Sequence, residues 1–192
     1  MFSTGFDLKK WASGGIKYQF HSVLHSHKLF RRMLTLGVPT LCVMNGMTIA
    51  GGLLFALMHD FRVMRDDGDR SFACLSEINV GLSLPPGFAA MVKHQLDPQT
   101  SRLMMFGGRF NAQQCLKMRV VDDVYKTRED IQGKIAAFAK EYAPKGEHRL
   151  TLKDYKNNMH ALTDSALRDG GVTYLEMAGA KPFDLGVLKG KL

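Results

Sequence analysis

The chain has 192 residues, of which 45% are hydrophobic and 23% are charged, and its formal net charge is +8. These values are typical of a single globular domain that is large enough to bury a core, and they exclude a disordered chain. The positive charge suits an anionic ligand. The basic residues are nevertheless spread along the chain without zinc-ligand spacing, so nucleic acid is not the favoured partner.

The first predicted elements are a short strand end and a long helix. Residues 2–5 have the composition of a strand that runs into a glycine turn. Residues 18–36 carry apolar side chains at helical spacing with basic residues opposite, which predicts an amphipathic helix. His21 and His25 lie one turn apart on it and could bind a metal ion. No carboxylate or third ligand is near, so we expect a solvated face and no metal site.

Residues 38–60 form the stretch around which the chain is organised. Residues 40–44 predict a buried strand, Asn45-Gly46 a turn, and Gly51-Gly52 the start of a buried helix. The unpaired N–H groups of a helix start can hold an anion or a developing oxyanion, and glycines let a ligand approach the backbone. Alternatively, the glycines serve only close helix packing, and their spacing alone favours this second interpretation.

Residues 61–64 and 71–75 predict two further strands, and a single carboxylate, Glu77, follows the second one among apolar neighbours. If Glu77 is buried, its pKa is raised, which suits proton transfer near neutral pH. The equal alternative is a surface glutamate that caps a helix or forms an ion pair. The residues alone do not separate the two.

The remainder of the chain is predicted to be mainly helical. Gly170-Gly171 is expected to end the last helix, and residues from 178 onward are expected to form a frayed tail. The other predicted elements are helices at residues 98–107, 112–118 (capped by Asn111), 131–142 and 150–168, and a strand at residues 120–125. Strands that alternate with helices indicate an α/β arrangement.

The cysteines and the apolar runs bear on the compartment. Cys42, Cys74 and Cys115 are widely spaced and odd in number, which predicts reduced, buried thiols in a reducing compartment. No secretory signal peptide is visible at the start of the sequence. Residues 38–58 are uncharged, but proline, asparagine and glycines interrupt them, so we expect a strand and a buried helix and no membrane span.

Four stretches, taken together, resemble the crotonase (enoyl-CoA hydratase/isomerase) superfamily. They are FSTGFDLKKW at residues 2–11, VPTLCVMNGMTIAGG at 38–52, LSEINVGLSLPPG at 75–87 and FNAQQCLKMRVVDDVY at 110–125. Within the superfamily, the segments 45–60 and 76–82 are most similar to the plant-type and peroxisomal Δ3,Δ2-enoyl-CoA isomerases. The resemblance implies a crotonase-like ββα superhelix over residues 1–125, without the family's first strands, and a C-terminal helical region and tail over residues 126–192. It also implies a left-handed residue at Arg119, where the family has a helix-ending glycine.

The resemblance also implies roles for single residues. Two backbone N–H groups, of Thr4 and Gly51, would hold the thioester oxygen as an enolate forms, and Glu77 would be the acid/base. The second carboxylate of hydratases falls on Leu54, and the extra carboxylate of dienoyl-CoA isomerases falls on Pro85. Since hydration needs a water activated between two carboxylates, a single glutamate fits an isomerase.

The resemblance therefore implies isomerisation of 3-enoyl-CoA to trans-2-enoyl-CoA in fatty-acid β-oxidation. Asp7, Lys9, Lys10 and Gly52 are assigned to binding of the acyl-CoA, which is the substrate, and no cofactor or metal is expected. The family also implies a homotrimer or hexamer. The alternative, from a different class, is a catalytically inactive crotonase-like subunit of a larger assembly. The C-terminal Gly-Lys-Leu, residues 190–192, resembles the peroxisomal address Ser-Lys-Leu, and the mitochondrion is the alternative location.

Overall fold

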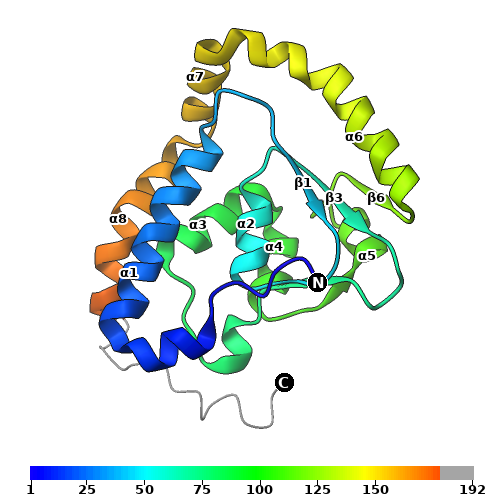
Figure 1. Ribbon diagram of the computed structural model, residues 1–192. Coiled ribbons are helices and arrows are strands. Elements are labelled where there is room, and N and C mark those ends of the chain that lie inside the picture. The colour runs from blue at the N-terminus through cyan, green and yellow to red at the C-terminus, as the bar shows by residue number, and fades with distance from the viewer. Residues whose placement is uncertain (178–192) are drawn as a thin grey trace.

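The computed structural model describes residues 1–177, in which helices surround two small sheets (Figure 1). The expected frayed tail and the C-terminal tripeptide lie outside the described residues. The strands are β1 (Leu41–Met44), β2 (Thr48–Ile49), β3 (Phe61–Arg65), β4 (Phe72–Cys74), β5 (Phe110–Asn111) and β6 (Asp123–Tyr125). The α-helices are α1 (Leu8–Leu34), α2 (Gly51–Leu57), α3 (Pro86–Gln95), α4 (Pro98–Met105), α5 (Ala112–Lys117), α6 (Arg128–Tyr142), α7 (Arg149–Met159) and α8 (Ala161–Met177). Two 3₁₀-helices, η1 (Glu77–Val80) and η2 (Ala143–His148), complete the described elements.

The first four strands alternate between the two sheets. One sheet has the order β1-β3-β6 and is parallel throughout. In the other, of order β2-β4-β5, β2 and β4 are parallel and β5 is antiparallel to β4. The chain thus adds one strand to each sheet and then forms a helix. It does so first as β1-β2-α2 and then as β3-β4-η1-α3. This repeat is the expected α/β arrangement of ββα turns.

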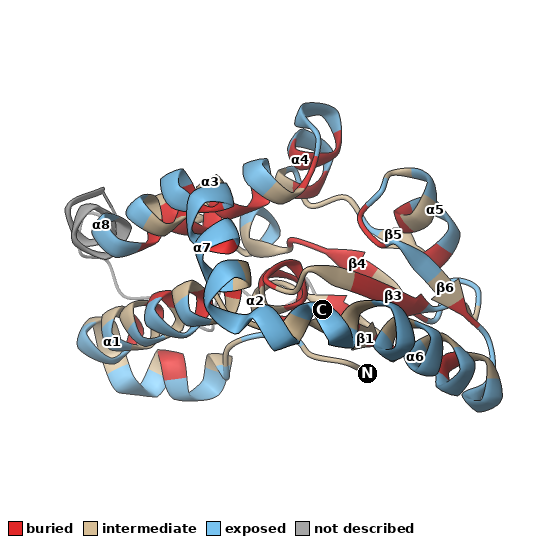
Figure 2. Ribbon diagram, turned by 90° about the horizontal axis from the view of Figure 1, so that it is seen from above, coloured by how far each residue is buried: buried red, intermediate tan, exposed pale blue. Residues whose placement is uncertain are grey.

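The hydrophobic core lies where α2 and α3 meet the strands. Leu53 and Leu57 of α2, Met64 of β3 and Met91 of α3 are fully buried. Figure 2 shows buried residues on β3 and β4 and on the helices that cover them. Residues 38–58 are a strand and a buried helix, as expected, and no described helix has the length and hydropathy needed to cross a bilayer.

Most predicted elements are confirmed to within three residues at either end. Arg119 has a φ of 56° where it follows α5, so the expected left-handed residue is confirmed. The side chain of Asn111 accepts a hydrogen bond from the Gln114 N–H, and that of Gln114 accepts one from the Asn111 N–H, which confirms the predicted cap. All three cysteines are buried and free, as expected.

The start of the first helix was predicted too late. The helix α1 begins at Leu8 instead of residue 18, because the Asp7 carboxylate accepts hydrogen bonds from the N–H groups of Lys9 and Lys10 and caps it. Gly15, at φ 65° and ψ −174°, kinks the helix. The residues before the kink therefore do not continue the helical periodicity of the residues after it. His21 and His25 are exposed, as expected of a solvated face.

The C-terminal helices also differ from prediction. Residues 150–168 form parts of two helices, α7 and α8, which are separated at His160 (φ −102°, ψ 12°). Gly170-Gly171 does not end α8, which continues to Met177. Glycine disfavours a helix by only about 1 kcal/mol, and α8 packs against α1 and α3. The helix α3, which α8 covers, was not predicted because its hydrophobic residues lack a clear periodicity.

Candidate active site

Three neighbouring extended segments of the second sheet end at the same edge. Ser3 bridges Thr48 of β2 in parallel, and β2 pairs in parallel with β4. Thr4 follows the first segment, Gly51 lies just after β2, and Glu77 lies just after β4. Because the carboxyl ends of parallel strands meet at one edge of a sheet, the three predicted catalytic residues are brought together there.

A sharp turn joins β2 to α2. Ala50 has a φ of 52°, unusual for a residue with a side chain. Its N–H donates to the Cys74 carbonyl at 2.9 Å, and its carbonyl accepts from the N–H groups of Leu53 and Leu54 at 2.9 and 3.1 Å. Gly51 is the first residue of α2, so its N–H has no partner in the helix. Among the described residues, none accepts a hydrogen bond from the N–H of Gly51.

Glycines let the N-terminal segment lie directly against this turn. Gly5 has a φ of 84°, and a Cβ on it would lie 2.6 Å from the Gly51 nitrogen. A Cβ on Gly52 would lie 2.5 Å from the Ser3 carbonyl oxygen. Close packing, the simpler explanation of the glycine pair, is therefore correct for Gly52. The same packing places the Thr4 segment beside the Gly51 N–H.

The three residues line a common cavity of about 190 Å³. Thr4 and Gly51 lie on its wall together with Glu77, and no residue of the described chain accepts a hydrogen bond from the Thr4 N–H. Much of the remaining wall is apolar and includes Phe6 and Trp11, whose rings stack with centroids 4.9 Å apart. Such a wall suits an apolar substrate chain and lowers the local dielectric constant around a polar group.

Glu77 has the environment of a proton-transfer group. Its Oε2 is buried and has no hydrogen-bond partner within the described part of the chain, and no ion pair involves it there. Burial raises the pKa of the Glu77 carboxyl above its ordinary value. Of the two interpretations left open by the sequence, the structure supports a desolvated carboxylate instead of a surface ion pair.

The other predicted carboxylate positions lie on the same cavity. Leu54, which is 1% exposed, and Pro85 both line it, so Glu77 is the only carboxylate among the described lining residues. Sequence reasoning missed Arg109, the only Lys or Arg among them. Its guanidinium carbon lies 5.0 Å from the centroid of the Phe72 ring. No motif marks Arg109, and only the packing of β5 beside β4 places it there.

The residues assigned to acyl-CoA binding lie apart from the cavity wall. Asp7 uses its carboxylate to cap α1, and the side chains of Lys9 and Lys10 are exposed. Gly52 is buried against Ser3. These four assignments stay predictions. Within residues 1–177, no group of three or more His, Cys, Asp or Glu side chains could hold a metal ion.

The fold and this site define a class of protein. The chain belongs to the enoyl-CoA hydratase/isomerase family, whose model matches residues 1–178. The chain is similar to "Enoyl-CoA delta isomerase 2, peroxisomal" of Arabidopsis thaliana, with 32% identity over 139 residues that cover 68% of this chain and 57% of that protein. It is also similar to "Enoyl-CoA delta isomerase 3" of the same plant, with 35% identity over 128 residues that cover 63% of this chain and 52% of that protein.

The chain spans about half the length of these relatives. Among solved structures, the human mitochondrial delta3-delta2-enoyl-CoA isomerase superposes with a TM-score of 0.77 at 20% identity, covering 98% of this chain and 75% of that one. The two chains share a fold. The resemblance to the crotonase superfamily is confirmed.

Proposed function

We propose that this chain isomerises 3-enoyl-CoA thioesters to trans-2-enoyl-CoA thioesters, a step of fatty-acid β-oxidation. The observation that carries the proposal is the composition of the cavity wall, which combines one desolvated carboxylate, Glu77, with the backbone N–H groups of Thr4 and Gly51. The names of the two plant relatives, both delta isomerases, support it further.

The proposed reaction needs only these groups. The Glu77 carboxylate removes a proton from C2, and the electron pair of that C–H bond forms a dienolate whose negative charge rests on the thioester oxygen. The N–H groups of Thr4 and Gly51 donate hydrogen bonds to this oxygen, and each such donor is worth about 3 kcal/mol of barrier. Glu77 then returns the proton to C4, which leaves the double bond between C2 and C3. The acyl-CoA is the substrate, and the proposal includes no further cofactor.

Isomerisation is favoured over hydration because of what surrounds Glu77. A hydratase must bind and activate a water molecule, and a second carboxylate on the cavity would serve that purpose. Leu54 and Pro85 line the cavity and occupy the two positions where a second carboxylate is expected in related enzymes. Neither side chain can accept a proton from a water molecule. One carboxylate that shuttles one proton suffices for a shift of the double bond.

The test is the identity of the product. The purified chain, incubated with a 3-enoyl-CoA, is expected to form trans-2-enoyl-CoA, seen by the ultraviolet absorbance of the conjugated thioester and by chromatography. Incubated with trans-2-enoyl-CoA, it is expected to form no 3-hydroxyacyl-CoA. Hydration without isomerisation would contradict the proposal.

One observation favours the second function, an inactive subunit of a larger assembly. Among the described strands, β1 pairs only with β3, on one side. An apolar hollow of about 410 Å³ is lined by Leu41 and Val43 of β1 and by residues of α6 that include Ile135 and Phe138. An unpaired strand edge is a template for another strand. Binding of the acyl-CoA without turnover, by a chain that elutes only in a complex, would select this function over the isomerase. Assembly as a homotrimer or hexamer is likewise a proposal.

A further inference from the structure

The helix α1 carries an unusual charge pattern. Its 27 residues contain no Asp or Glu, although the whole chain has 18 acidic residues. The helix contains six Lys or Arg residues and three His residues. An excess of one sign along a helix produces a local electrostatic field that attracts a partner of opposite charge.

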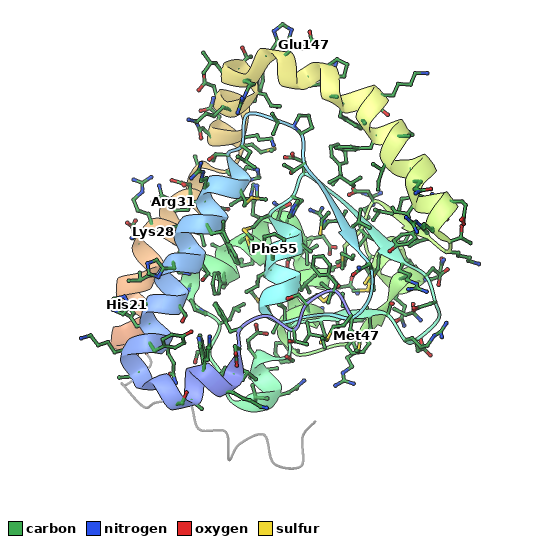
Figure 3. The ribbon with its side chains drawn as sticks, in the orientation of Figure 1. His21, Lys28, Arg31, Met47, Phe55 and Glu147 are labelled. Carbon is green, nitrogen blue, oxygen red and sulfur yellow. The ribbon has the colours of Figure 1, made fainter. Side chains whose placement is uncertain are left out.

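The basic residues beyond the kink at Gly15 gather on one face. At 3.6 residues per turn, five of them fall within an arc of about 80°. All five are exposed: Lys17, His21, His25, Lys28 and Arg32. We call these five residues the cationic face of α1. His21 and Lys28 follow one another along α1 (Figure 3). From Lys17 to Arg32 the face is about 22 Å long.

Apolar side chains border the cationic face along one side. Tyr18 and Leu29 continue the same exposed arc to about 120°, and they are 42% and 47% exposed. The opposite side of α1 is the one packed into the protein, where Val23, Phe30 and Leu34 are buried. Exposed basic residues beside exposed aromatic and aliphatic residues on one helix are typical of helices that lie on a membrane surface.

A polar groove lies at the C-terminal end of the cationic face. It has a volume of about 330 Å³ and is lined by Lys28, Arg31, Arg32, Thr35, Asn157 and Asp164. The Asp164 carboxylate is already paired with Arg31 and Arg168, at 2.7 Å each. Asp169, the other acidic residue near Arg31, accepts a hydrogen bond from the Ser165 hydroxyl. Lys28 and Arg32 have no ion-pair partner among the described residues, so they are available to an anion in the groove.

We propose that the cationic face of α1 binds the surface of an anionic membrane, with a lipid phosphate in the groove between Lys28 and Arg32. A membrane explains the apolar border as well as the charge, because Tyr18 and Leu29 would enter the headgroup region. A nucleic acid would explain only the charge, since the face offers no row of aromatic residues on which bases could stack. The contact is peripheral and independent of the catalytic proposal.

The test compares two variants of equal net charge. The triple variant Lys17→Gln, Lys28→Gln, Arg32→Gln neutralises the cationic face. The control, Lys126→Gln, Arg128→Gln, Lys140→Gln, removes three exposed charges at and near α6, on the opposite side of the molecule (Figure 1). All six positions are exposed, so both variants are expected to fold, which thermal unfolding checks. Sedimentation with vesicles of phosphatidylcholine, with and without phosphatidylserine, measures binding.

The native chain is expected to sediment with the anionic vesicles only and to be released by high salt. Each Lys or Arg near an anionic surface strengthens binding by about fivefold, so the cationic-face variant is expected to bind roughly 100-fold more weakly, while the control changes little. Three results would overturn the proposal. They are no binding to anionic vesicles, equal losses in the two variants, and tighter binding of the native chain to duplex DNA or RNA than to vesicles.

Discussion

At the scale of single residues, the central feature is a carboxylate in an apolar cavity. Desolvation makes the Glu77 carboxylate a stronger base than an exposed glutamate, because water no longer stabilises its charged form. No other described residue of the cavity wall is an Asp or Glu. A proton that Glu77 takes up therefore has no second carboxylate there to which it could move. One glutamate would therefore both remove and return the proton.

The first prediction concerns Glu77 itself. Glu77→Gln keeps the size of the side chain and removes its ability to take up a proton, so turnover of a 3-enoyl-CoA is expected to fall by roughly 100-fold or more. Steady-state assays measure the loss. Glu129→Gln, an exposed change on α6, serves as the control and should retain native turnover. Native turnover by Glu77→Gln would remove the assignment.

The second prediction concerns pH. The pKa of Glu77 is raised, and the proposed reaction starts from its deprotonated form. The rate is therefore expected to fall as the pH drops through this raised pKa, which lies above the ordinary glutamate value of about 4.3. A profile of kcat/KM against pH measures the position of this acid limb. A limb at or below the ordinary value would show that Glu77 is not desolvated in solution.

At the scale of elements, the site depends on two backbone turns in contact. The turn at Gly5 and the turn at Ala50 bring the segment after Ser3 against the first turn of α2. The N–H groups of Thr4 and Gly51 can face the same cavity only if no side chain at Gly5 separates the two turns. The third prediction concerns this contact.

Gly5→Ala is expected to abolish turnover and lower stability, because its Cβ would lie 2.6 Å from the Gly51 nitrogen. Gly68→Ala is the matched control, since Gly68 has a similar φ of 72° but nothing within 4 Å of its Cβ position. Both substitutions cost about 1–2 kcal/mol for a left-handed alanine, so only the clash distinguishes them. Turnover and thermal unfolding measure the difference. Equal effects of the two changes would mean that the contact does not matter.

A buried ion pair joins α7 to the rest of the domain. Lys156 of α7 is 3% exposed, and its Nζ lies 2.6 Å from Asp60 Oδ2 and 2.8 Å from the Val38 carbonyl oxygen. The same Asp60 oxygen accepts hydrogen bonds from the N–H and the hydroxyl of Thr40. The pair thus joins α7 to the segment that leads into β1 and to the start of β3.

The fourth prediction follows from this pair. Lys156→Met leaves the Asp60 carboxylate without its cation, and breaking a buried pair in this way costs about 3 kcal/mol of unfolding free energy. Lys153→Met, on an exposed position of the same helix, is expected to change it little. Denaturant unfolding measures both variants. Similar stabilities for the two would show that Lys156 does not hold α7 in place.

At the scale of the whole molecule, the cationic face of α1 and the candidate active site lie on different parts of the surface. The cavity opens at the carboxyl edge of the second sheet, whereas the cationic face lies on the outer side of α1. A chain that binds acyl-CoA at one and a membrane at the other would meet apolar substrates near their source.

The fifth prediction concerns the compartment of this protein. One plant relative is named peroxisomal, and residues 190–192 of this chain are Gly-Lys-Leu. We expect a fluorescent reporter fused to the last dozen residues to enter peroxisomes. The same reporter with Leu192 deleted should stay diffuse. Diffuse signal from both would remove the argument for peroxisomal import, and import of the whole chain into mitochondria would favour the alternative location.

The sequence by itself determined the family and the local elements of this protein. Short apolar runs and helix caps depend on neighbouring residues, so β1, β3 and the cap at Asn111 could be predicted. The motif around Glu77 identified the acid/base candidate. Leu54 and Pro85 indicated that the cavity lacks a second carboxylate. Each of these inferences depends only on residue types and their spacing along the chain, and the sequence gives both.

The tertiary structure alone decided which residues share a surface. It made Glu77 a desolvated carboxylate, since burial depends on what packs around it and not on its neighbours in the chain. It placed Arg109 on the cavity and let α8 run through two glycines, because packing outweighs local propensity. It also left the cationic face of α1 in solvent, because α8 and Phe88 of α3 pack against the opposite side of the helix.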